Sequence, residues 1–228
     1  MSTEQDFRHA PAFVFGLKRG SSLPAATLPP VPDVLAYEIV DDHVVITACD
    51  KEAETVVIPA EIEGKPVTEI GDKAFLNCRE LQSIEIPDSI TAIGNSAFYG
   101  CSKLTDIMLP ASVTTIGATA FYGCRLLRSI AIPGSITTIY SYAFENCRRL
   151  TNIVITDGVT KIGNSAFAAC DAMTSVTIPA SVTAIGDNAF SGCPLRDFYY
   201  TGTVAQWSAV SVGPGNDALY SAVHHFEA

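Results

Sequence analysis

The stretch Leu81 to Lys103, LQSIEIPDSITAIGNSAFYGCSK, is the unit from which most of this chain is built. Its second half recurs as EIGDKAFLNC (69–78), AIGNSAFYGC (92–101), TIGATAFYGC (115–124), TIYSYAFENC (138–147), KIGNSAFAAC (161–170) and AIGDNAFSGC (184–193). The cysteines that end these six copies are always 23 residues apart. A fixed period of this length indicates a solenoid, in which each repeat buries its apolar side against its neighbours. We therefore expect an elongated scaffold rather than a round core.

The first part of the repeat has the pattern of a short strand. Ile84 and Ile86 alternate with polar residues, and Pro87 ends the strand because proline lacks the N–H that pairing needs. Equivalent strands of successive coils are expected to pair in parallel, about 4.8 Å apart. The positions between the apolar residues then form an outward face.

The second part has the pattern of a short helical turn. Gly94 is expected to adopt a positive φ at a tight turn, since it has no Cβ. Ala97, Phe98 and Cys101 suit one face of a helical turn. Stacking would place the phenylalanines in one buried column and the cysteines in another, as small apolar residues. The phenylalanines of this column are Phe75, Phe98, Phe121, Phe144, Phe167 and Phe190.

The pattern I-P-x-S-V-T-x-I-G-x-x-A-F-x-x-C resembles the BspA-like (treponemal-type) leucine-rich repeats, over roughly residues 36–228. The resemblance implies an α/β repeat fold. It is a right-handed leucine-rich-repeat solenoid with a 23-residue period, short parallel strands and short helical turns. Two departures lie near the middle of the array, where Tyr140 replaces the turn glycine and Thr156 replaces the proline. We expect local distortion there rather than a break.

The sequence outside the regular repeats predicts a leader and two caps. Residues 1–35 lack the repeat and contain a proline-rich run, which predicts a flexible leader. Within the repeat domain (36–228), residues 36–80 predict an N-terminal hairpin cap and an irregular first repeat. After the regular repeats (81–193), residues 194–228 predict a C-terminal cap. Its final strand ends at Tyr200, and a helix over residues 204–210 carries Trp207.

Charge and composition exclude several classes of function. The net charge is −10, and residues 37–88 hold thirteen acidic against four basic residues. This acidic end argues against nucleic acid as a partner. No apolar run is long enough to span a membrane, and the N-terminus lacks the pattern of a signal peptide. The resemblance nevertheless implies a secreted or cell-surface protein.

The chain carries no motif for catalysis, a cofactor or a metal. Its histidines are His9, His43, His224 and His225, all outside the repeats, and the cysteines form no C-x-x-C pair. Neighbouring cysteines of one column would be close in space, but their parallel side chains have poor disulfide geometry. The sequence therefore predicts a protein that is not an enzyme and uses no cofactor. A solvated tail is the simplest interpretation of the C-terminal histidine pair.

Two surfaces are candidates for partner binding. On the outward strand face the apolar candidates are Met108, Val154 and Tyr199. A basic stripe along one edge gathers Arg79 and Lys103 with the candidate contacts Arg125, Arg128, Arg148 and Arg149. Candidate partners of the stripe are an acidic protein, a sulfated glycan or a second copy of the chain.

The expected function is a non-catalytic leucine-rich-repeat scaffold for protein–protein interactions. By resemblance, its partner is a host or matrix protein that meets a bacterial surface. The alternative is a structural spacer without a ligand of its own, which a repeat surface lacking concentrated hot spots would favour.

Overall fold

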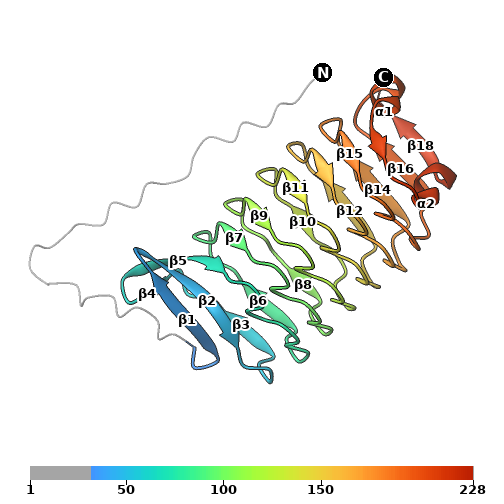
Figure 1. Ribbon diagram of the computed structural model, residues 1–228. Coiled ribbons are helices and arrows are strands. Elements are labelled where there is room, and N and C mark those ends of the chain that lie inside the picture. The colour runs from blue at the N-terminus through green and yellow to red at the C-terminus, as the bar shows by residue number, and fades with distance from the viewer. Residues whose placement is uncertain (1–31, 228) are drawn as a thin grey trace, which may run out of the picture.

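The computed structural model describes residues 32–227, so the predicted leader lies outside the described residues up to residue 31. The described chain is a parallel β-solenoid, with its coils side by side from the blue hairpin to the red C-terminal elements (Figure 1). Each regular coil contributes one strand to each of two sheet faces and closes with a turn. The solenoid, the 23-residue period and the parallel pairing are as predicted.

The strands of the first face carry the outward positions considered above, and we call it the strand face. Its first sheet contains β3 (Thr55–Val57), β6 (Ser83–Glu85) and β8 (Asp106–Ile107). Its second sheet contains β10 (Ala131–Ile132), β12 (Asn152–Ile155), β14 (Ser175–Ile178), β16 (Asp197–Tyr200) and β18 (Val223–Phe226). The register follows the repeat: Ser83 pairs with Asp106, and Ala131 with Val154.

The second face is built mainly from two-residue strands. One sheet contains β5 (Lys65–Ile70), β7 (Ala92–Ile93) and β9 (Thr115–Ile116). Another contains β11 (Thr138–Ile139), β13 (Lys161–Ile162), β15 (Ala184–Ile185) and β17 (Ser211–Val212). The pairs again step by one period, as in Thr138 with Lys161.

The predicted N-terminal hairpin covers the first coil. It is formed by β1 (Leu35–Val40) and β2 (His43–Cys49), which pair antiparallel, and β2 then pairs in parallel with β5. The loop of the irregular first repeat is itself a small hairpin, because β4 (Glu61–Ile62) folds back on β5. The first open end of the solenoid is therefore covered by its own chain.

The C-terminal cap contains the predicted helix and two elements that the sequence did not predict. The helix α1 (Val204–Ser208) begins with a capping box between Thr203 and Gln206, and its Trp207 packs 4.6 Å from Phe198 between ring centroids. A second helix, α2 (Asp217–Ser221), and the strand β18 follow. The prediction that β16 is the last strand was wrong, because β18 pairs with it in parallel.

The turns that close the coils alternate their hydrogen bonds instead of forming helices. Ala97, Tyr99 and Cys101 donate their N–H groups within the turn, to residues three positions earlier. Phe98 and Gly100, like the other alternate residues, donate to the next coil, at 2.7 and 2.8 Å. A helix would keep all these donors within one coil. We call the resulting row of bonds between coils the turn ladder.

The turn ladder depends on residues with positive φ at two places in each coil. Ser96 (φ 55°) and Gly100 (φ 74°) flank the phenylalanine of their coil, and equivalent residues do so in the other repeats. Gly94 is not among the residues with positive φ, so the reason predicted for this glycine was wrong. A Cβ at Gly94 would lie 2.5 Å from the backbone nitrogen of Asp72, so glycine is needed for close approach of two coils.

Both faces are interrupted between the same two coils, near the middle of the array. Among residues 32–227, β9 has no pairing with β11, and β8 meets the next coil only through the bridge between Asp106 and Ser129. Tyr140 in this coil carries the Cβ that the equivalent glycines lack. The turn ladder continues across the gap, with Phe121 N donating to Ala143 O at 2.8 Å. The expected local distortion is thus present without a break.

The core is a set of columns that run through all coils. Phenylalanine rings stack with centroid distances of 4.9 to 5.3 Å from Phe75 to Phe190, and every ring is fully buried. The cysteines beside them donate to a carbonyl of the preceding coil, as Cys124 Sγ does to Phe98 O at 3.2 Å. Cysteine at this position therefore combines a small apolar side chain with a weak donor.

Candidate functional site

The apolar candidates of the strand face share one column of exposed side chains. Register places Val154 beside Ala131 and Thr177, and Thr177 beside Tyr199. Met108 follows β8 at the equivalent position, and its side chain is 87% exposed. Val154 is 56% exposed and Tyr199 41%. The column therefore exposes apolar side chains that contribute little to the core.

Tyr199 is the centre of a small aromatic site at the C-terminal end of this column. The ring of His225, on β18, stacks on it with centroids 4.4 Å apart and an interplanar angle of 13°. His225 Nε2 lies 2.9 Å from Asp197 Oδ1, so the imidazole is held from two sides. The interpretation of His225 as part of a solvated tail was wrong. Its strand has no counterpart in the repeat pattern, so the sequence carried no signal for this contact.

A shallow cavity adjoins Met108 where the strand face is interrupted. It measures about 420 Å³, and its walls include Glu85, Ile86, Asp106 and Leu109 together with Met108. Because β8 has no strand beside it beyond the bridge at Asp106, these side chains are not covered by a neighbouring coil. The most exposed apolar residue of the column therefore borders a hollow.

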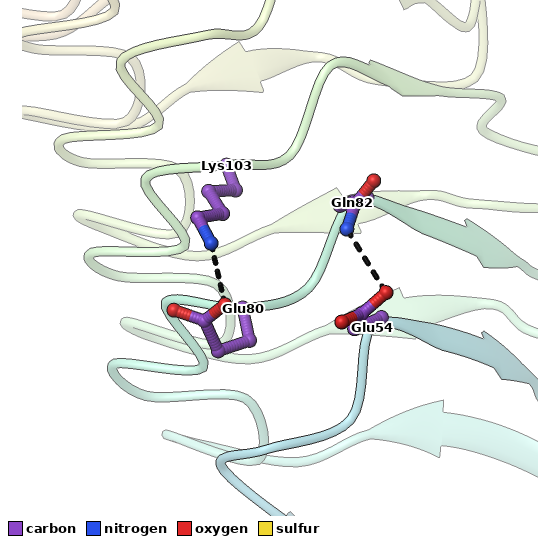
Figure 2. A network of polar contacts seen from close by, with 4 residues as sticks. All are labelled: Glu54, Glu80, Gln82 and Lys103. Atoms are coloured by element: carbon purple, nitrogen blue, oxygen red, sulfur yellow. Dashed lines mark hydrogen bonds and ion pairs between the residues drawn. The ribbon is translucent and has the colours of Figure 1, made fainter.

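The predicted basic stripe is partly neutralised. Lys103 Nζ lies 2.5 Å from Glu80 Oε2, as Figure 2 shows, and Gln82 binds Glu54 on the adjacent coil in the same view at 3.2 Å. Glu80 also raises the pKa of the Lys103 ammonium through this contact. The positive charge of Lys103 therefore belongs to a local pair, which weakens the stripe at this position.

The arginines of the stripe lie in different surroundings. Arg148 Nε donates to Asn146 Oδ1 at 2.9 Å and lies 3.7 Å from Asp171 Oδ2. Arg128 begins the strand segment of its coil, where its N–H donates to Thr105 O, and its side chain is exposed. Arg149 is exposed as well, and Arg125 lies at the turn beside a stacked pair of tyrosines. The structure therefore gathers Arg125 into a local site and leaves Arg128 and Arg149 as separate exposed charges.

The cysteines are buried and free, and their pKa values follow from their surroundings. Burial raises the pKa of Cys147 to about 12, so this thiol stays protonated and donates to Phe121 O. At the N-terminal end, a hydrogen bond between the Cys49 and Cys78 thiols lowers the pKa of Cys78 to about 7. Lys51 Nζ, 3.8 Å from Cys78 Sγ, lowers it further, while burial opposes both. Cys78 is nevertheless fully buried, which closes it to solvent.

The part of the chain that the structure describes holds no group of three or more histidine, cysteine, aspartate or glutamate side chains placed to bind a metal ion. No helix within residues 32–227 is long and apolar enough to cross a membrane. His43 lies in the hairpin strand β2, far along the chain from His224 and His225. The arrangement supports recognition by surfaces better than chemistry at a site.

Stacked 23-residue coils with an apolar column on each side define a leucine-rich-repeat solenoid. The family model described as BspA type Leucine rich repeat region matches residues 66–205 in six copies. The chain belongs to this family, as the resemblance predicted.

Solved structures give the same fold. The crystal structure of the T. pallidum Leucine Rich Repeat protein is 31% identical over 84% of this chain and 89% of that chain, with a TM-score of 0.75. A leucine-rich repeat protein from Bacteroides capillosus is 26% identical over 74% of this chain and 95% of that one, with a TM-score of 0.34. A leucine rich cell surface protein from Faecalibacterium prausnitzii is 19% identical over 78% and 96%, with a TM-score of 0.28. A search of curated proteins found no match.

Proposed function

We propose that this protein is a non-catalytic scaffold that binds another protein through its strand face. The observation that carries the proposal is the single column of exposed apolar side chains at Met108, Val154 and Tyr199. Repeat proteins commonly bind partners along such extended surfaces, where contacts recur at the spacing of the coils. The proposed partner is a host or matrix protein met by a bacterial surface.

The shape and chemistry of the column support a protein partner. Its apolar residues are separated by small or polar ones, such as Ala131 and Thr177, so that an extended surface can make contact without steric obstruction. Tyr199 and the stacked His225 add a rigid aromatic anchor at one end. The exposed charges Arg128 and Arg149, with Arg125 and Arg148, are proposed to steer an acidic partner rather than to anchor it.

Binding to immobilised matrix proteins, sulfated glycans and the protein itself, at low and physiological salt, tests the proposal. A Met108→Glu/Val154→Glu variant places charges in the apolar column and is expected to lose binding to the protein partner. Val204→Glu/Tyr220→Glu is the matched control, because both residues are 58% exposed and lie on the C-terminal helices. Equal binding by both variants would exclude the strand face.

An Arg125→Glu/Arg148→Glu/Arg149→Glu variant separates the two surfaces. If only this variant loses binding, and wild-type binding weakens at physiological salt, the basic stripe is the binding surface instead. If the wild-type protein binds none of the panel, the binding proposal is wrong and the spacer function takes its place. Folding of each variant is checked by thermal unfolding.

A further inference from the structure

The turn edge of the solenoid contains a trough that the repeat does not produce elsewhere. Gly100 and Gly123, on adjacent coils, form its floor because neither has a side chain to fill it. Tyr99 and Tyr122 form one wall, with parallel rings 4.7 Å apart between centroids at an interplanar angle of 5°. The trough encloses about 420 Å³, a volume suited to a small ligand or a short stretch of a chain.

The opposite wall and the two ends are polar and positively charged. Arg79 and Arg125 lie two coils apart on the second wall, with Ser102 between them. Successive coils are about 4.8 Å apart, so the two guanidinium groups are separated by roughly 10 Å along the trough. Asn77 closes one end and Asn146 the other. The trough therefore presents two cations and several hydrogen-bonding side chains around a flat floor.

The floor offers no free backbone donors to a ligand. Gly100 N donates to Tyr122 O, and Gly123 N donates to Glu145 O, each at 2.8 Å. A peptide therefore finds no strand edge to pair with here, and the trough has no deep apolar pocket for a side chain. Recognition must come from guanidinium, amide and hydroxyl groups. These groups are complementary to a ligand that combines negative charge with many hydroxyls.

We propose that this trough binds an acidic saccharide, a sugar chain that carries sulfate or carboxylate groups. A guanidinium group forms paired hydrogen bonds with either anion, so Arg79 and Arg125 would each hold one anionic group of the chain. Ser102 and the asparagine side chains at the ends meet sugar hydroxyls between and beyond those groups. Two anion contacts two coils apart select a repeating chain over a single free anion.

Neighbouring charges confine the site to this part of the edge. Asp171 takes the place of the arginine two coils beyond Arg125, and Arg148 between them is held by Asp171 and Asn146. Glu145 follows Tyr122 in the column of the tyrosine wall. An anionic chain longer than the trough would meet these carboxylates, so a short segment is expected to give the full affinity.

Calorimetric titration with a sulfated hexasaccharide and with a hexamer of a uronic acid tests the proposal at low and physiological salt. A neutral hexasaccharide and an oligoglutamate of similar charge are the comparison ligands. Binding of either acidic saccharide, with little or none of the two comparison ligands, is expected. Binding of the sulfated or the carboxylated hexamer alone identifies the anion.

Two pairs of variants locate the binding. Arg79→Gln/Arg125→Gln is expected to weaken it about tenfold or more, as loss of charge-assisted hydrogen bonds should. Arg128→Gln/Arg149→Gln removes the same charge outside the trough and serves as the control. Gly123→Asn fills the floor and should abolish binding, while Gly192→Asn makes the same change two to three coils away. Asparagine adopts the required positive φ at the equivalent Asn77 and Asn146, so the substitution is compatible with the fold.

Equal weakening by the two arginine pairs would show diffuse charge attraction and overturn the site. So would oligoglutamate binding as tightly as the saccharides, or no saccharide binding by the wild-type protein. The trough lies on the turn edge, away from the strand face, and the ligands differ from the matrix proteins used there. Failure of this proposal and failure of the proposed function are therefore distinguishable.

Discussion

The turn edge and the two sheet faces of this solenoid respond differently to irregular sequence. The turn ladder and the phenylalanine column run without interruption from the coil of Phe75 to that of Phe190. Both sheet faces, by contrast, are interrupted between the coils of Thr115 and Thr138. The same pair of coils is therefore continuous on one side of the molecule and open on the other.

The difference shows which interactions hold the coils together. Across the interruption, the rings of Phe121 and Phe144 remain 5.3 Å apart, and Ser135 Oγ still donates to Val113 O of the preceding coil. Two-residue strands contribute few hydrogen bonds, whereas a buried phenylalanine removes a large apolar surface from water. The core and turn ladder thus keep the coils in register, and the strand face is free to vary for binding.

Removing one ring from the core should have the largest effect. Phe121→Ala is expected to lower the free energy of unfolding by about 3–5 kcal/mol, because a fully buried ring leaves a cavity between two stacked neighbours. Urea unfolding measures the change. Leu126→Ala, at a side chain 40% exposed in the same coil, is the control and should cost much less. A loss below about 1 kcal/mol for Phe121→Ala would contradict a core held by the aromatic column.

The C-terminal end of the turn ladder depends on one buried side chain. Asn216 is 1% exposed, and its amide accepts from Phe190 N at 3.0 Å and donates to Gly186 O and Gly213 O. Asn216→Ala leaves these backbone groups unpaired and is expected to cost about 1–3 kcal/mol. Hydrogen exchange should show faster exchange of the Phe190 amide.

The matched control for this prediction is Asn164→Ala. Asn164 also accepts a backbone N–H from the adjacent coil, that of Asp187 at 3.0 Å, but this bond is exposed. Water can replace an exposed acceptor, so the control should cost about 0.5 kcal/mol or less. Equal losses in the two variants would show that Asn216 does not cap the ladder.

A methyl group at the glycine column tests why the sheets are interrupted. A Cβ at Gly163 would lie 2.5 Å from the backbone nitrogen of Ser141, so Gly163→Ala should cost about 1–3 kcal/mol as the coils move apart. Tyr140→Ala, in the coil that is already displaced, should change stability by less than about 0.5 kcal/mol. Thermal unfolding compares the two. A similar loss in both would mean that the glycine column does not set the spacing.

The smallest expected effect concerns the pH dependence of Glu145, beside the tyrosine wall. Burial raises the pKa of this carboxyl, so the folded state holds its proton more tightly than the unfolded state. The free energy of unfolding therefore falls as pH rises from the ordinary glutamate pKa to the raised one. Glu145→Gln should flatten this change, by less than about 0.5 kcal/mol because the group is partly solvated. An unchanged pH profile would show that Glu145 is not desolvated.

The repeat explains how much of the structure was predictable. Ile93, Phe98 and Cys101 were predicted to be buried, and they are, because the same contacts recur in every coil and the pattern reports them six times. The hairpin cap and the helix with Trp207 followed from short local signals. The positive φ was assigned to Gly94 instead of Ser96 because a serine with left-handed backbone carries no signal in a single repeat.

The candidate sites were less predictable because they depend on departures from the repeat. The outward column of Met108, Val154 and Tyr199 could be read from the strand period. His225 could not be joined to it, because β18 has no repeat pattern and its pairing with β16 closes a long loop. The trough was also missed. Its glycine floor and its ends at Asn77 and Asn146 emerge only when positions from four coils are placed side by side.

The sequence by itself determined the coil, the family and the columns of the core, because a fixed period forces equivalent residues to pack on one another. Only the tertiary structure decided where the sheets open, which arginines remain without an acidic neighbour, and that Tyr99 and Tyr122 face Arg79 and Arg125 across a trough. The physical reason is that packing within the core repeats from coil to coil, while surface contacts depend on particular residues in neighbouring coils. The fold is therefore written once in each repeat, and the candidate binding sites are written across several.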